Sequence, residues 1–259
     1  MDADTAFFVE RIESDQQIEQ KILAALAADS KLLGDCLLPL YFNNERAGVA
    51  CATWGNDPAR ARQHFYVCGR IAVMRVEQFN DPLLHYGLRE FCYALFSDCE
   101  ALINRLATLP LRTDEHTRKV VTAAERGGPG IYSLALLAIM RGDWQAMHRH
   151  LEVIERRTPV SRANRRMVLD TAVFRAFGAR DAQAARAAIE SLVTPKCHAR
   201  RNDDPLLGKF ISLPAAGYAK LANRLGIHVE FEHPLIPSTL MPISPLPRYE
   251  DPYPFLTRM

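Results

Sequence analysis

Apolar and polar residues alternate with a helical period along most of the chain. Apolar residues recur three and four positions apart, a spacing that places them on one face of an α-helix. Prolines, glycines and short polar stretches separate these segments. The pattern therefore predicts an all-α protein. The clearest segments span residues 16–33, 58–79, 82–96, 97–109 and 214–226.

Three windows repeat one arrangement when they are aligned on an aspartate. They are GVACATWGNDPARARQHFYVC (48–68), LALLAIMRGDWQAMHRHLEVI (134–154) and AVFRAFGARDAQAARAAIESL (172–192). Each contains an apolar run with one alanine in common, a break that ends in the aspartate, and apolar residues at three fixed positions after it. In chain order, these residues are Ala52, Asp57, Ala61, Phe65 and Cys68; Ala138, Asp143, Met147, Leu151 and Ile154; and Ala176, Asp181, Ala185, Ile189 and Leu192.

Each window predicts an αα-hairpin whose second helix is capped by the aspartate. A carboxylate just before a helix accepts hydrogen bonds from the unpaired N–H groups of its first turn. Pro58 would occupy the first helical position, where no N–H is needed. Asp143 and Asp181 lie 38 residues apart, near the period of helical-repeat proteins. Since only three copies are clear, the sequence predicts stacked antiparallel hairpins in a repeat-like bundle rather than a named repeat class.

Local signals predict where helices begin and end. Ser97, with Glu100 three residues later, has the spacing of a capping box. Gly226 is a candidate left-handed stop for the last helix. We therefore expect a helical domain over residues 1–226, with a possible subdivision at GGPG (127–130).

The character of the chain changes after Gly226. IHVEFEH (227–233) alternates apolar and polar residues, which predicts a short strand. Seven of the sixteen prolines lie between Pro234 and Pro254, so this part can form neither helix nor central sheet. It is nevertheless too apolar for a solvated end. We expect residues 227–259 to form an extended tail packed on the helices.

Charge is unevenly distributed, although the net charge is only +2. Residues 1–35 hold eight acids against three bases, and residues 141–209 hold fourteen bases against eight acids. The asymmetry indicates either a charged partner surface or solvated helix faces. On the first reading, a cationic partner would relieve repulsion among acids of the first helix. A second candidate contact lies in the aromatic tail, which competes with packing on its own helices. The candidate partner-binding residues are Glu10, Glu13, Asp15, Glu19, Tyr249, Asp251 and Tyr253.

The sequence contains no recognisable catalytic or metal motif. His148 and His150 would point about 200° apart on a helix, so they cannot jointly hold one metal ion, and we place them at the boundary of a buried face. GGPG lacks the lysine and the preceding strand of a phosphate-binding loop. Ser133, Ser161 and the pair at 203–204 are best interpreted as helix caps. We predict no catalytic residues, no metal and no cofactor.

Other sequence features bear on partners and compartment. The arginine-rich stretch 155–166 has no interleaved aromatic residues for base stacking, so we expect a solvated turn rather than direct nucleic-acid binding. The six cysteines form no C-x-x-C pair. No apolar run reaches about 18 residues, and the N-terminal residues lack the basic stretch and apolar run of a secretory signal. We therefore expect a cytoplasmic protein without membrane contact.

Several stretches together resemble one known family. NDPARARQHFYVCGRI, FSDCEALINRLATL, AIMRGDWQAMHRHLE and YEDPYPFL are similar to the corresponding parts of immunity protein 49. That family comprises bacterial antidotes encoded beside polymorphic or contact-delivered toxins. The resemblance implies an all-helical protein, without catalytic residues, that binds a cognate toxin, often a nuclease, inside the producing cell. A nuclease is basic where it meets phosphates, so the acidic start of this chain would complement it.

Three functional hypotheses follow from the sequence. The first is an immunity protein that occludes the active site of a toxin or blocks its assembly. The toxin would be a nuclease effector of a secretion system used in bacterial competition. The second is a helical-repeat adaptor or regulator without a toxin partner. The third is an enzyme whose site is assembled from dispersed histidine, aspartate and arginine residues. The lack of motifs favours a binding protein over an enzyme.

Overall fold

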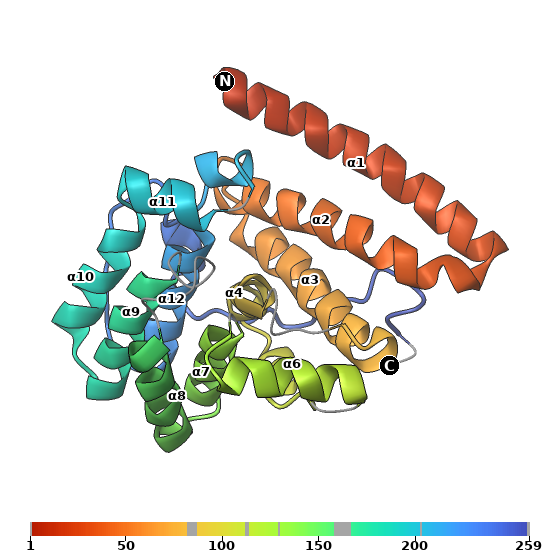
Figure 1. The fold of residues 1–259 in the computed structure, drawn as a ribbon. Helices are drawn as coiled ribbons and strands as arrows, with labels where there is room; N and C mark the ends of the chain where they lie inside the picture. The colour runs from red at the N-terminus through yellow and green to blue at the C-terminus, as the bar shows by residue number, and fades with distance from the viewer. Residues whose placement is uncertain are drawn as a thin grey trace.

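The structure is a computed structural model that describes residues 2–81, 87–111, 114–128, 130–157, 167–202 and 204–257. The predicted cap Ser161, most of the arginine-rich stretch 155–166 and one acid of the 203–204 pair lie outside these residues. The prediction of an all-α fold is confirmed, since the described residues form twelve α-helices and no sheet (Figure 1). They are α1 (Ala3–Ala28), α2 (Leu33–Ala52), α3 (Pro58–Phe79), α4 (Gly87–Ser97), α5 (Glu100–Ala107), α6 (Glu115–Glu125), α7 (Ile131–Met140), α8 (Trp144–Arg157), α9 (Val168–Ala179), α10 (Ala182–Leu192), α11 (Pro195–Arg201) and α12 (Leu213–Arg224).

The three predicted hairpins are α2–α3, α7–α8 and α9–α10. In each one the aspartate caps the second helix. The carboxylates of Asp57, Asp143 and Asp181 accept the N–H groups three residues later, at 3.0, 2.9 and 2.9 Å. The apolar residues that the three windows share are all buried, which joins the hairpins to one core. The capped-hairpin prediction is therefore confirmed in all three copies.

The turns that precede the three caps also share a backbone conformation. Asn56, Gly142 and Arg180 have positive φ angles of 45°, 69° and 52°. A left-handed residue reverses the chain, so that the N–H of the next residue, Asp143 in the second hairpin, bonds back to the carbonyl of Ala138 at 2.8 Å. Only Gly142 adopts this conformation without a steric cost to Cβ. The second hairpin thus has the least strained of the three turns.

Helix ends confirm one local prediction and contradict two. Ser133 is not a cap, because it lies inside α7, which begins at Ile131 after Gly130. Gly226 (φ 71°) ends α12, and the N–H of Ile227 bonds to the carbonyl of Ala222 at 2.9 Å, as expected for a Schellman motif. The capping box at Ser97 is wrong. Ser97 is the last residue of α4, and its hydroxyl donates to the carbonyl of Ala94 at 2.6 Å. Because α4 continues through Ser97, α5 begins only at Glu100.

The predicted strand at residues 227–233 does not form. In the described chain no strand pairs with it, and His233 makes only an isolated bridge to Ile236. The alternation is real, because Ile227 and Val229 are buried while His228 and Glu230 are exposed. The segment is extended and packs one side on the helices, but no neighbouring strand lies beside it.

A buried carboxylate anchors the chain that follows. Asp98, between α4 and α5, is fully buried and has a left-handed backbone (φ 57°). It pairs with Arg62 of α3 at 3.0 Å and with Lys220 of α12 at 2.7 Å. It also accepts the N–H of Ser244 at 3.1 Å, and Arg62 and Lys220 both donate to the carbonyl of Pro242. The start of the tail is therefore bonded to two helices and one interhelical turn.

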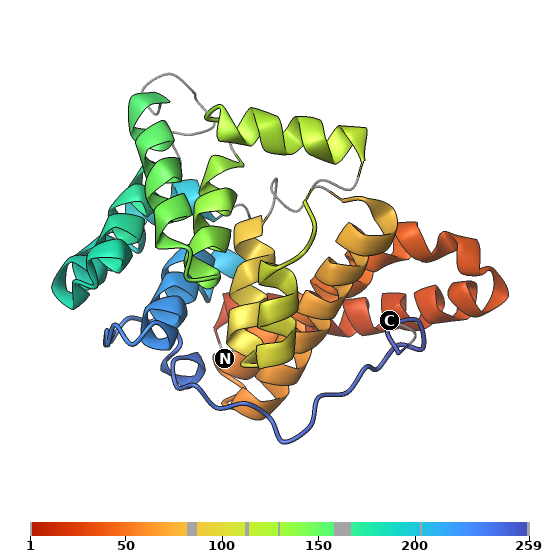
Figure 2. The same cartoon turned by 90° about the horizontal axis from the view of Figure 1, so that it is seen from below.

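The rest of the tail runs along α3 toward the end of the chain (Figure 2). The side-chain amide of Gln63 bonds both the carbonyl and the N–H of Glu250, at 2.7 and 3.1 Å. Arg70, two turns further along α3, donates to the carbonyl of Leu256 at 2.6 Å. Tyr253 is buried and accepts from Asn44 of α2 at 2.7 Å. Side chains of α2 and α3 thus bond the tail along most of its length.

Candidate functional site

An open, hollowed surface surrounds residues 230–239. It consists of two hollows, of about 570 and 380 Å³, that share the walls Phe231, Glu232 and His233. The first lies between these residues and the end of α10, and the second lies between them and the α2–α3 turn at Ala52 and Thr53. We call the two hollows together the groove. The groove therefore lies between the end of α10 and the α2–α3 hairpin, with residues 230–239 between them.

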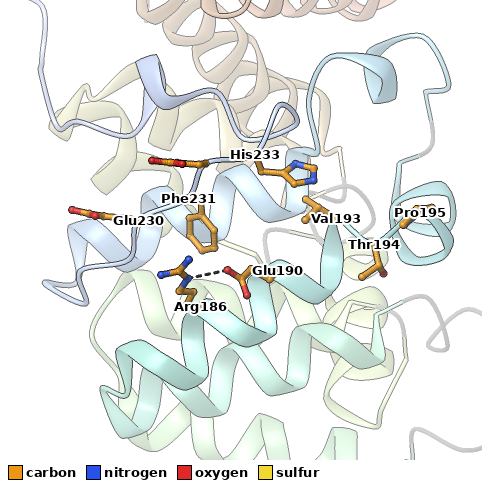
Figure 3. A pocket seen from close by; sticks show the side chains of 9 residues that line it. Arg186, Glu190, Val193, Thr194, Pro195, Glu230, Phe231 and His233 are labelled. Carbon is orange, nitrogen blue, oxygen red and sulfur yellow. Dashed lines mark hydrogen bonds and ion pairs between the residues drawn. The ribbon is translucent and has the colours of Figure 1, made fainter.

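Local sequence positions both walls of the first hollow. Helix α10 ends at Leu192, and Pro195 begins α11 at its first position, so the chain turns sharply at Val193 and Thr194. On the opposite wall, the ring of Phe231 points toward Arg186 and Glu190 of α10, whereas Glu230 points away from them (Figure 3). Arg186 and Glu190 are one helical turn apart and bond at 2.8 Å. The first hollow is therefore lined by the ring of Phe231 beside the bonded pair Arg186 and Glu190 (Figure 3).

The groove is acidic. The hydrogen bond from Arg186 to Glu190, together with the charges of Glu190, Glu230 and Glu232, raises the pKa of Arg186. Arg186 is the only basic residue other than His233 among those lining the two hollows. Within the described chain, Glu230 and Glu232 are exposed and have no hydrogen bond or ion pair. Two carboxylates are thus available to an external cation.

The backbone beside these carboxylates is also unbonded. Among the described residues, the N–H and C=O groups of His228, Glu230 and Glu232 have no hydrogen-bond partner. The N–H of Val229 does have one, the side-chain oxygen of Asn223 on α12 at 3.2 Å. In an extended chain, alternate residues direct their backbone groups to the same edge. One edge of the segment therefore faces α12, and the other edge, which we call the free edge, is unpaired.

The structure separates the four predicted acids of α1. Glu10 and Glu13 are exposed. Asp15 is buried and pairs with Arg46 of α2 and with Arg11, the latter at 3.3 Å. Glu19 is half-buried and accepts the hydroxyl of Tyr253 at 2.9 Å. The four carboxylates do not form one open face, because the packing of α1 on α2 and the tail uses two of them.

The predicted tail residues also make internal contacts. Tyr249 donates to the carbonyl of Ser97 at 2.6 Å. Asp251 accepts the hydroxyl of Tyr66 at 3.1 Å and pairs with Arg70 at 3.2 Å. Tyr253 is only 2% exposed. Their described contacts hold the tail on α1, α2, α3 and the end of α4.

The histidines of α8 and α3 differ in exposure and in bonding. On α8, His148 is exposed and His150 is half-buried, with its pKa lowered by burial. His64 of α3 is bonded to Asn44 at 3.0 Å, and burial lowers its pKa to about 4. In the part of the chain that the structure describes, no group of three or more histidine, cysteine, aspartate or glutamate side chains has an arrangement that could hold a metal ion.

Two buried carboxyls were not anticipated from the sequence. Glu45 of α2 accepts from Arg89 and Tyr93 of α4, at 2.7 and 2.5 Å. Burial raises the pKa of Glu45 and of the neighbouring Glu90 to about 7. Neither residue lines the groove, so both belong to the contact between α2, α3 and α4.

None of the described helices combines the length and the apolar character that a membrane crossing requires.

The groove residues carried a signal that sequence reasoning used only in part. The alternation of residues 227–233 predicted a strand and, with it, a polar face at His228, Glu230 and Glu232. The missing information was the lack of a partner strand, which depends on the whole fold.

Comparison with known families bears on the identity of the chain. A family model described as Immunity protein 49 matches residues 16–240. Neither a curated protein nor a solved structure gave a match. The matched range contains the three capped hairpins and every residue that lines the groove.

Proposed function

The chain belongs to the immunity protein 49 family, and we propose that it binds a cognate nuclease toxin directly and occludes its active surface. Family membership makes it an immunity protein of a toxin–immunity system. The nuclease activity of the toxin, direct occlusion and action in the cytoplasm are parts of our proposal. The role is binding rather than catalysis.

The observation that carries the nuclease assignment is the pair of carboxylates at the groove. Glu230 and Glu232 are exposed and form no hydrogen bond or ion pair within the described chain, although their charges reach Arg186 across the first hollow. A nuclease holds the phosphates of its substrate with lysine and arginine side chains. Carboxylates that approach those cations compete with the substrate and speed the encounter of the two proteins.

Apolar contacts support a complex that is more than electrostatic. The walls of the groove include Phe231, Val193 and Ile236, and aromatic side chains at the centre of an interface contribute most of its binding energy. On α1, Phe7 is 58% exposed and lies one helical turn from Glu10. We therefore retain Glu10 and Glu13 as a second acidic contact at the margin of the interface.

Co-expression with the toxin domain encoded beside this chain's gene tests the proposal. We expect growth to be rescued, and the purified chain to inhibit degradation of nucleic acid at a one-to-one ratio. Rescue without any nuclease activity in the toxin would contradict the nuclease assignment. Binding without rescue would instead favour the adaptor function.

Charge reversal separates the two acidic contacts. Glu10→Lys with Glu13→Lys changes only α1, and Glu230→Lys with Glu232→Lys changes only the groove. We expect the groove variant to slow association by about tenfold or more at low salt, and the α1 variant to slow it less, with both effects shrinking as salt rises. Equal rates for wild type and both variants would contradict an electrostatic role for either surface.

A further inference from the structure

The segment at residues 228–232 has the properties of a sheet edge without a sheet. It is extended, its side chains alternate between buried and exposed, and the backbone groups of His228, Glu230 and Glu232 lack partners in the described structure. We propose that the toxin supplies the missing strand, adding an extended segment to this free edge. This inference rests on the proposed function and specifies the contact through which it is carried out.

The first argument is the hydrogen-bonding capacity of the edge. The N–H and C=O groups of His228, Glu230 and Glu232, three exposed residues, have no hydrogen bond within the described chain. An added strand bonds such groups in a ladder, which provides affinity largely independent of side-chain identity. The opposite edge is not equivalent, because Asn223 bonds Val229 and Ile236 bonds the carbonyl of His233 at 2.9 Å. The edge of Val229 and His233 is therefore partly bonded, whereas the edge of His228, Glu230 and Glu232 has no bond within the described chain.

The second argument is the chemistry beside the edge. In the segment, Glu230 and Glu232 are two residues apart and lie on the same face. Cross-strand neighbours of opposite charge stabilise a strand pair. The partner segment should therefore carry lysine or arginine at alternate positions, which is the composition expected of a phosphate-binding surface.

The third argument is the space around the segment. The two hollows share Phe231, Glu232 and His233, so there is room on both sides of the residues that would be paired. Phe231 already packs toward α10, which fixes the segment before a partner arrives (Figure 3). A strand docked here would bury the groove and place its basic side chains against the two glutamates.

A proline scan distinguishes backbone pairing from charge. Glu230→Pro removes both the carboxylate and one N–H of the free edge, whereas Glu230→Gln removes only the charge. Since that N–H has no partner in the described chain, both variants should melt like wild type. Glu232→Pro provides the same test one step along the edge. Arg248→Pro is a matched control on an exposed, extended part of the tail.

Binding is measured by calorimetry against the same toxin domain, inactivated by a substitution in its own active site. We expect Glu230→Pro and Glu232→Pro to weaken affinity by about tenfold or more, Glu230→Gln by only a few-fold at low salt, and Arg248→Pro not at all. Equal affinities for Glu230→Pro and Glu230→Gln would overturn strand addition and leave the immunity function standing. A wild-type chain that fails to bind the toxin would overturn both, and a wild-type dimer abolished by Glu230→Pro would reassign the edge to self-association.

Discussion

Residues 228–232 and residues 242–256 both lie outside the helices after α12, yet they differ in how their polar groups are used. Along the tail, the carbonyls of Pro242, Glu250 and Leu256 accept side-chain donors of α3 and α12. In the segment at 228–232, one edge has no bonds to the described chain. A path outside the helices therefore does not by itself indicate an interaction site, and the unbonded backbone groups are what distinguish the segment that we propose as the toxin contact.

The comparison also separates two kinds of conspicuous side chain. Tyr249, Asp251 and Tyr253 are polar and aromatic, which is typical of interfaces, but all three are bonded within the molecule. Glu230 and Glu232 are ordinary glutamates whose importance comes from their lack of partners. The contacts of the tail are internal, whereas Glu230 and Glu232 form no bond within the described chain, which supports our proposal that the toxin binds at the groove.

The largest effect should come from the carboxylate that anchors the tail. Asp98→Ala leaves Arg62 and Lys220 buried without their counter-charge, which should lower the free energy of unfolding by about 3–5 kcal/mol. Denaturant titration measures this loss. A loss below about 1 kcal/mol would show that the tail does not depend on Asp98.

Acid should destabilise the contact around His64, whose partner Asn44 also bonds Tyr253 of the tail. Burial lowers the pKa of His64 to about 4, so its neutral form is favoured in the folded state. The associated stability is complete above the unfolded pKa of about 6.5 and is lost as the pH falls toward 4, by about 2 kcal/mol at pH 5.

The matched variant for this prediction is His64→Gln, which keeps a polar group beside Asn44 but does not titrate. Thermal melts of the two proteins from pH 7.5 to pH 4.5 should show wild type losing more stability than the variant. Parallel curves would contradict a buried neutral His64.

The hairpin caps provide an intermediate case, exposed but bonded. Asp181 accepts the N–H of Ala184 at 2.9 Å, and Asp143 does the same for Ala146. Asp143→Ala and Asp181→Ala should each cost about 0.5–2 kcal/mol by thermal melt. Wild-type stability in both variants would show that the shared aspartates do not cap these helices.

The smallest expected changes in stability come from one variant at the tail and one at the groove segment. Gln63→Ala removes a side chain that bonds both backbone groups of Glu250, and should cost about 0.5–1.5 kcal/mol. Glu232→Ala removes no bond in the described structure and should stay within about 0.5 kcal/mol of wild type. Urea titrations that rank the two variants in the opposite order would break the distinction between the tail and the groove segment.

Features set by neighbouring residues were predictable from the sequence. Asp57, Asp143 and Asp181 cap helices that begin at the next residue, so three or four positions of sequence determine the bond. Ser97 has the same local signal, but the end of α4 decides what its hydroxyl bonds. Local pattern therefore predicts hairpins better than it predicts an individual cap.

Features set by long-range packing were not predictable. Asp15 is paired with Arg46, 31 positions away, and Glu19 with Tyr253, 234 positions away. No local pattern reveals either contact, so the acids of α1 looked equally exposed. The strand pattern at 227–233 was visible in the sequence, but only the folded chain reveals that the segment has no partner strand.

Backbone amide exchange is the most direct test of the central claim, that the toxin binds the unpaired edge at residues 228–232 while the tail remains an internal element. In the free protein, the amides of His228, Glu230 and Glu232 should exchange rapidly, and those of Ser244 and Glu250, which are bonded, slowly. On binding the inactivated toxin domain, the three edge amides should become protected and the two tail amides should not change. Edge amides that remain unprotected in a saturated complex would contradict the account.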